Sequence, residues 1–129
     1  MSYPPEFLYT KEHEWIRVDD AVGTIGITHH AQKELGDIVF VELPKTGDHV
    51  AAGETFGTVE SVKAVSDVYA PVTGEVVAVN SKLQDKPELL NSEPHDEAWL
   101  IRVRLKDRRE TESLMTAEQY EAYLQEAAH

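Results

Sequence analysis

One lysine stands apart from the other basic residues, in the stretch TFGTVESVKAVSDVYAPVTG at residues 55–74. Lys63 lies between two runs of β-branched and small residues. Such runs favour β-strands, so the spacing predicts a hairpin with Lys63 at or beside its turn. A lysine amine is a compact nucleophile on a flexible stem, and at a turn it projects into solvent. Lys63 is therefore either an ordinary surface lysine or a site that another enzyme acylates.

Other side chains that do chemistry show no known catalytic or metal-binding spacing. The adjacent His29 and His30 would point about 100° apart on a helix. The serines form no nucleophile elbow, the glycines form no phosphate-binding loop, and there is no cysteine. We therefore predict no metal site, no catalytic residue and no enzyme activity of the chain's own. None of the six histidines has zinc-ligand spacing: His13, His29, His30, His49, His95 and His129.

Charge and composition exclude several classes of partner. The chain has 129 residues and a net charge of −12, which disfavours nucleic acid and anionic membrane surfaces. No apolar run approaches the length needed to span a bilayer. The N-terminal residues have neither signal-peptide nor transit-peptide character, so we expect a bacterial-type cytoplasmic protein.

The elements that must position Lys63 are mostly short strands. The run DIVFVEL at 37–43 is apolar on both faces, which predicts a strand in the middle of a sandwich. Residues 99–105 alternate, with Trp99 and Ile101 expected on the same face. The expected strands are Glu14–Val18, Gly23–Ile27, Asp37–Leu43, His49–Val50, the two runs that flank Lys63, Gly74–Asn80 and the alternating segment 99–105.

Helices are expected at three places. Residues 28–36 have Thr28 as N-cap and a glycine stop, and Pro87–Leu90 suits one helical turn. Thr116 and Gln119 form a capping box for a helix at about 116–127, with an apolar stripe of Tyr120, Tyr123 and Leu124. The fold class is thus mainly β. It is a flattened barrel or sandwich of antiparallel sheets with a short internal helix and a C-terminal helix, in one domain spanning 1–129.

The longer stretch GDHVAAGETFGTVESVKAVSDVYAPVTGEVVAVN at 47–80 resembles the lipoyl and biotinyl carrier motif. In that motif the lysine sits on a hairpin between a Gly-Asp turn and Pro-x-x-Gly. Biotinyl domains typically have methionine on both sides of the lysine, whereas Val62 and Ala64 favour lipoate. With KEHEW, GITHHAQKELGDIVFVELP and PELLNSEP, the chain is identified as a member of the glycine cleavage system H protein family from about Tyr9 to the final helix.

This resemblance implies a carrier with lipoic acid in amide linkage to Lys63. The arm would take the aminomethyl group of glycine from a pyridoxal-phosphate glycine decarboxylase (P protein) to a tetrahydrofolate-dependent aminomethyltransferase (T protein). A dihydrolipoyl dehydrogenase (L protein) would then reoxidise it. Lipoylating enzymes are implied as further partners. The implied setting is glycine catabolism and one-carbon metabolism.

The resemblance also assigns roles to five acids and glycines. Glu14 and Asp67 match acids that guard the loaded arm, and Glu12 is a nearby extra acid. Glu60 and Gly74 match positions to which lipoylating enzymes respond. Each has an ordinary alternative: strand-edge acids, and a turn glycine that opens the next strand.

Two positions depart from the family pattern. Ala98 stands where many members have glycine, so that loop is expected to differ. Glu34 stands where plant members have a histidine near the arm, which leaves His30 as a candidate neighbour. Three other functions remain open: another lipoyl or biotinyl domain, an H-like protein that relays lipoate to other enzymes, and an unmodified interaction module.

Overall fold

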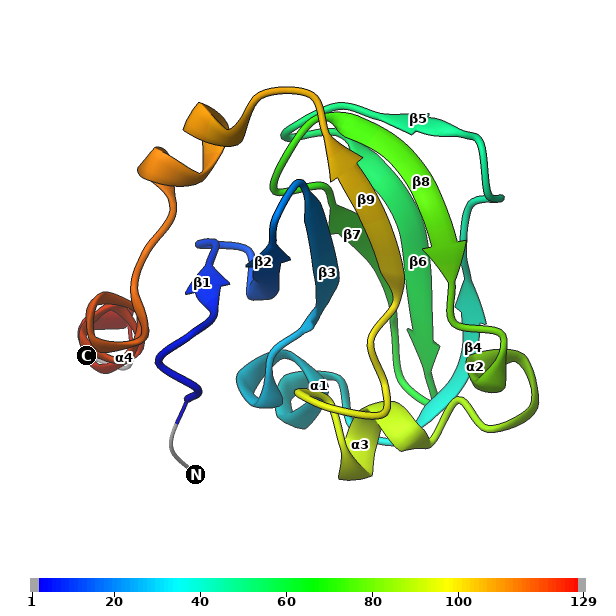
Figure 1. The fold of residues 1–129 in the computed structure, drawn as a ribbon. Helices are drawn as coiled ribbons and strands as arrows, with labels where there is room; N and C mark the ends of the chain where they lie inside the picture. The colour runs from blue at the N-terminus through cyan, green and yellow to red at the C-terminus, as the bar shows by residue number, and fades with distance from the viewer. Residues whose placement is uncertain (1–2, 128–129) are drawn as a thin grey trace.

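The structure, a computed structural model, describes residues 3–127 (Figure 1). His129, one of the histidines considered above, lies outside them. Two antiparallel sheets form the body of the molecule, and their strands wrap around a common core (Figure 1). The predicted mainly-β sandwich with an internal and a C-terminal helix is confirmed.

The larger sheet has six strands. The hairpin between β2 (Glu14–Asp19) and β3 (Val22–Ile27) turns through Asp20, whose φ of 55° is a left-handed value that aspartate tolerates. In spatial order the strands are β1 (Leu8–Tyr9), β2 (Glu14–Asp19), β3 (Val22–Ile27), β9 (Ile101–Leu105), β8 (Gly74–Val79) and β5 (His49–Val50).

The smaller sheet carries the predicted lysine hairpin. Its order is β4 (Ile38–Glu42), β6 (Thr55–Ser61) and β7 (Val65–Tyr69). The core fills the space between the sheets with aliphatic residues from both, among them Ile25, Val76, Val103, Val41, Val59 and Val68. Their burial supplies the main stabilisation and fixes the hairpin against the larger sheet.

Helix α1 (His29–Leu35) begins as predicted: the Thr28 side chain accepts the N–H of Ala31, and Gly36 ends the helix with φ 81°. One-turn helices α2 (Lys82–Asp85) and α3 (Leu89–Ser92) follow β8. Figure 1 shows α1 and α3 at the end of the sandwich where β6 turns into β7. Helix α1 is therefore a neighbour of Lys63.

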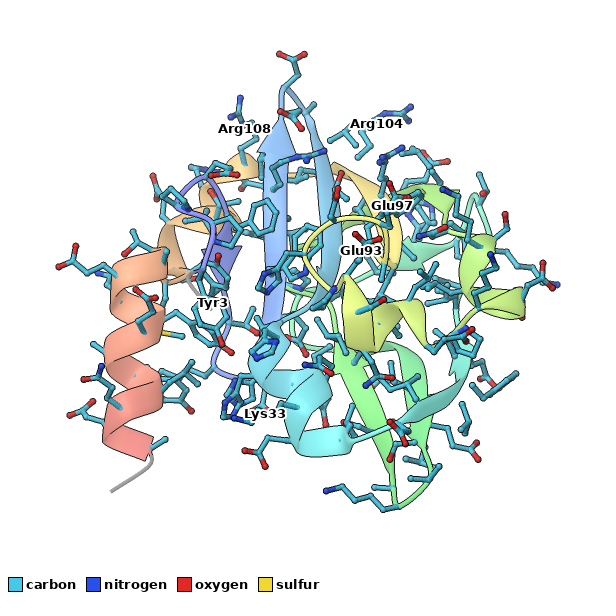
Figure 2. The ribbon with its side chains drawn as sticks, turned by 90° about the horizontal axis from the view of Figure 1, so that it is seen from below. Tyr3, Lys33, Glu93, Glu97, Arg104 and Arg108 are labelled. Atoms are coloured by element: carbon cyan, nitrogen blue, oxygen red, sulfur yellow. The ribbon has the colours of Figure 1, made fainter. Side chains whose placement is uncertain are left out.

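Helix α4 (Ala117–Ala127) follows a 3₁₀ turn, Arg108–Ser113. Its capping box is confirmed, because the Thr116 N–H donates to Gln119 Oε1 (2.9 Å) and the Gln119 N–H donates to Thr116 Oγ1 (3.2 Å). Tyr120 is fully buried and stacks on Tyr9, with ring centroids 4.8 Å apart. Figure 2 shows Tyr3 between α4 and the strands, where its ring also meets Tyr120. The predicted apolar stripe thus packs α4 on a second, aromatic cluster.

Two sequence expectations were wrong in detail. Strand β4 is not central but an edge strand, and a bulge between Ile38 and Phe40 turns both Val39 and Phe40 outward. Trp99 does not follow the face of Ile101: its ring packs on the aromatic cluster, with the Arg102 guanidinium 4.2 Å above it. Strand β1, helix α2 and the 3₁₀ turn were not predicted.

Candidate functional site

The turn that carries Lys63 is held by hydrogen bonds to the Ser61 side chain and by backbone hydrogen bonds. The buried Ser61 Oγ accepts the N–H groups of Lys63 (3.2 Å) and Ala64 (3.1 Å), and the Ser61 N–H donates to the Ala64 carbonyl (2.8 Å). The Val62 N–H donates to the carbonyl of Asp37 at 3.0 Å. The backbone is therefore fixed relative to both β7 and the end of α1.

The Lys63 side chain is exposed. Within residues 3–127, its amine takes part in no ion pair or hydrogen bond. A Cβ added at Gly36 would meet the Lys63 Cε at 3.7 Å, so the stem lies along the end of α1. A free amine on a fixed turn is accessible for amide formation, so the site fits a covalent acyl group such as lipoate.

A cavity of about 310 Å³ opens beside this turn. Its wall combines three carboxylates with two imidazoles and a few apolar groups. A larger hollow of about 540 Å³ lies beside β5 and β8, at the opposite end of the sandwich from the β6–β7 turn (Figure 1). The smaller cavity adjoins the turn, because its lining includes Leu35, next to the Gly36 that the Lys63 stem approaches, and Ser66 of the strand that leaves the turn. Its lining residues are Glu12, His13, His30, Ala31, Glu34, Leu35, Ser66, Asp67 and Tyr69.

Glu14 lies behind that wall and is only 2 % exposed. Its carboxylate accepts the Thr10 hydroxyl (2.5 Å) and the backbone N–H of Tyr69 (3.1 Å). Burial raises the pKa of Glu14 to about 7, against these two hydrogen bonds, which lower it. Glu14 therefore carries a proton in equilibrium near neutral pH, next to a residue of the cavity wall.

Comparison with known proteins agrees with these features. The family model described as Glycine cleavage H-protein matches residues 7–127. The chain belongs to that family. Glycine cleavage system H proteins from two strains of Staphylococcus epidermidis are each 52% identical over 120 residues, covering 93% of this chain and 95% of the relative. Family membership implies a carrier role in glycine cleavage.

A solved structure shows the same fold. The crystal structure of a glycine cleavage system H protein from Mycobacterium marinum superimposes with a TM-score of 0.89 at 38% identity. The match covers 95% of this chain and 99% of that one. The two-sheet body and the helices that surround the lysine turn are therefore the architecture of the glycine cleavage H-protein family.

In this family member, the structure brings some predicted site residues together and separates others. Asp67 and Glu12 both line the cavity, as does Glu34. Glu60 lies on the outer face of β6, three residues before Lys63 and exposed. Gly74 does not approach Lys63: it is buried at the start of β8, at the opposite end of the sandwich (Figure 1).

The structure explains the glycine at position 74 by packing. A Cβ there would press on the carbonyl oxygen of Arg104 and lie 2.6 Å from Val103 Cγ1 on the neighbouring strand β9. Its φ is not positive, so turn geometry is not the reason for glycine. Ala98 likewise has no positive φ and is fully buried, so the loop accepts alanine without backbone strain.

An apolar patch surrounds the turn on the outer face. Among the described residues, the exposed large hydrophobic side chains are Val39 (48 %), Phe40 (49 %), Val62 (68 %) and Val65 (66 %). Phe40 pairs with Glu60 and Glu60 pairs with Val65 across the three strands, so this row shares one face. We call Val39, Phe40, Val62 and Val65 the turn patch.

Sequence reasoning missed His13 as a member of the site. It lines the cavity, and its ring centroid lies 4.4 Å from that of His30, the histidine that was a candidate neighbour of the arm. Over residues 3–127, no cluster of three acidic, histidine or cysteine side chains could hold a metal ion. Nor does that part of the chain include a helix long and apolar enough to cross a membrane.

Proposed function

We propose that this chain is the lipoyl carrier of a glycine cleavage system, with lipoic acid in amide linkage to Lys63. The observation that carries the proposal is the exposed Lys63 amine, which has no partner among residues 3–127, on a hydrogen-bonded turn beside a cavity with three carboxylates. When bound, the lipoyl group supplies a dithiolane for thiol–disulfide exchange. The chain itself supplies attachment and shelter and is not an enzyme.

The cavity suits a cationic cargo. An aminomethyl amine is protonated near neutral pH, and Glu12, Glu34 and Asp67 offer carboxylates to it. All three carboxylates are exposed, so water screens each attraction, and the preference for a cation comes from their lining one cavity together. These residues would hold the amine and limit its contact with water, which otherwise releases it as ammonia. Glu14 supports the wall through Tyr69.

The proposed partners are glycine decarboxylase, aminomethyltransferase, dihydrolipoyl dehydrogenase and the lipoylating enzymes. Each must accept the arm of Lys63 in its active site, so each must contact the surface around the turn. The turn patch is that surface, and exposed apolar groups of this kind mark interaction sites. Glu60, which pairs with Phe40 and Val65 of the patch, and the net charge of −12 favour partners with basic groups at the entrance of the active site.

The modification is tested by intact mass. Wild-type protein made with lipoate and a lipoylating enzyme should gain one lipoyl group, and Lys63→Arg should gain none because arginine cannot form the amide. Lys33→Arg on α1 is the matched control and should be modified like wild type. A lipoyl group found on Lys63→Arg would place the attachment elsewhere.

Turnover is tested next with the modified protein. It should support glycine–bicarbonate exchange by the decarboxylase, and the unmodified protein should not. Transfer of the lipoyl group to another lipoyl domain, without exchange activity, would instead support the relay function. The single carrier domain over 1–129 and the cytoplasmic location belong to the same proposal.

A further inference from the structure

His13 has a backbone conformation that its surroundings impose. Its φ of 73° lies in the left-handed region, which few residues other than glycine adopt. Its N–H donates to the Thr10 carbonyl (3.2 Å), and its carbonyl accepts the N–H of Thr28 (3.0 Å). Strained residues that neighbours hold in place gather at functional sites. Here the conformation accompanies an imidazole on the wall of the cavity.

Helix α4 reaches this imidazole through one hydroxyl. The Tyr120 oxygen lies 2.8 Å from His13 Nδ1 and 2.8 Å from Thr28 Oγ1. Thr28 Oγ1 already accepts the Ala31 N–H at 3.2 Å, and Thr28 is fully buried. Its own proton needs an acceptor, and within the described residues the Tyr120 oxygen is the one at hydrogen-bond distance.

The direction of the hydrogen bonds follows. Thr28 donates to Tyr120, and Tyr120 then has its one proton to give to His13 Nδ1. Nδ1 therefore accepts, and the proton of the neutral ring sits on Nε2. Protonating His13 would turn Nδ1 into a donor, and the hydroxyl proton of either Thr28 or Tyr120 would then lose its acceptor.

Other titratable groups around the cavity also affect the charge of His13. Burial and the adjacent His30 lower the pKa of His13, and Glu34 raises it by less. Two imidazoles 4.4 Å apart disfavour a second positive charge. The titratable groups that face His13 come from its own loop, α1, β7 and α4, and are Glu12, His30, Glu34, Asp67, Tyr120 and Tyr123.

We propose that Tyr120 is a positioning residue of the cavity beside the Lys63 turn, which we call the arm cavity. By donating to Nδ1 it keeps His13 uncharged, so that the cavity presents carboxylates and a neutral ring to the cationic amine. A protonated His13 would repel that amine. Through Tyr120, the C-terminal helix α4 thus helps to determine the charge of the cavity. The inference rests on the proposed function, but the state of His13 is measurable in the unmodified chain.

The first test is ¹⁵N NMR of the imidazoles in unmodified protein. Wild-type His13 should show an unprotonated Nδ1 and a protonated Nε2 at pH 7. Tyr120→Phe removes the hydroxyl and keeps the ring that stacks on Tyr9. The variant should show mixed tautomers and a titration midpoint about one pH unit higher, because the neutral form has lost its hydrogen bond.

Two variants separate positioning from packing. Thr28→Ser retains the hydroxyl and should keep the wild-type tautomer. Tyr123→Phe removes the next tyrosine hydroxyl of α4, which donates to the Lys11 carbonyl at 3.4 Å, and should leave His13 unchanged.

The second test follows release of the cargo from the loaded protein. Water breaks the carbon–sulfur and carbon–nitrogen bonds of the aminomethyl group, giving formaldehyde, ammonia and the free thiol. Tyr120→Phe should speed release several-fold at the acidic end of the pH profile, where His13 of the variant is protonated, and have little effect at pH 8. A wild-type His13 protonated on Nδ1 would overturn the proposal. So would a variant with the wild-type tautomer and release profile. Failure of wild type to take lipoate would refute the proposed function and leave the NMR result standing.

Discussion

The backbone N–H of Tyr69 donates to the buried carboxylate of Glu14 at 3.1 Å, across the space between the two sheets. Tyr69 ends the strand that leaves the Lys63 turn, and Glu14 begins β2 in the other sheet. This one bond ties the lysine hairpin to the larger sheet beside the arm cavity. Because this carboxylate is buried, the stability of the fold depends on pH.

Glu14→Gln should therefore change the pH dependence of unfolding. Burial raises the folded-state pKa of Glu14 from 4.5 to about 7, so the folded state holds this proton more tightly than the unfolded state. The resulting stability is complete below pH 4.5 and is lost as pH rises toward 7. Measured by urea unfolding, the free energy of unfolding of the variant relative to that of wild type should rise by on the order of 2–3 kcal/mol between about pH 4.5 and pH 8. The exposed Glu12→Gln should give a much smaller change, and a pH-independent difference for Glu14→Gln would contradict the prediction.

His95 should act in the opposite direction. Its Nε2 accepts the His29 N–H at 3.0 Å, and burial lowers its pKa to about 4. The folded state thus binds this proton less tightly than the unfolded state, so stability is lost as pH falls from 6.5 toward 4. Because the ring is only half-buried, we expect the free energy of unfolding of His95→Gln to fall by about 1–2 kcal/mol less than that of wild type over this pH range. The exposed His49→Gln is the control, and equal acid profiles for both variants would refute the assignment.

Gly74→Ala should destabilise the fold whatever its effect on lipoylation. The added Cβ would press on the Arg104 carbonyl oxygen, and backbone does not yield as a side chain does. We expect a loss of about 1–3 kcal/mol in chemical denaturation. Gly47→Ala is a useful comparison, since φ there is 97° and the space is open, and it should cost only about 1 kcal/mol. If Gly74→Ala slows lipoylation at full stability, Gly74 acts in recognition and not through packing.

Phe40→Ser should weaken partner binding with little effect on the fold. Phe40 is half-exposed on an edge strand, so its removal deletes more partner contact than core contact. In glycine–bicarbonate exchange with the decarboxylase, the KM for the carrier should rise several-fold while kcat and the melting temperature stay close to wild type. Thr55→Ser, at the far end of β6, should change neither constant. An unchanged KM for Phe40→Ser would show that the turn patch is not part of the interface with the decarboxylase.

What could be predicted from the sequence was local. The Thr28 cap, the Thr116–Gln119 capping box and the lysine hairpin depend on neighbours a few residues apart, and each formed as predicted. Asp67 and Glu12 were expected near the arm by resemblance, and both line the cavity.

The missed features depend on contacts between distant segments. Tyr120 and His13 are 107 residues apart, and nothing in the helical stripe distinguishes a hydroxyl that reaches a histidine. The bulge in β4 also follows from its pairing with β6. Hydrophobicity alone assigned Val39 and Phe40 to an interior strand, because periodicity cannot show where a register slips.

The position of β4 has a consequence for behaviour at high concentration. An edge strand with exposed apolar residues is a template on which a second copy could pair and begin an aggregate. The bulge interrupts the regular ladder that such pairing needs. A net charge of −12 repels like copies while it attracts basic surfaces. The protein thus exposes apolar side chains on an edge strand and still resists self-association, and high salt should weaken that protection first.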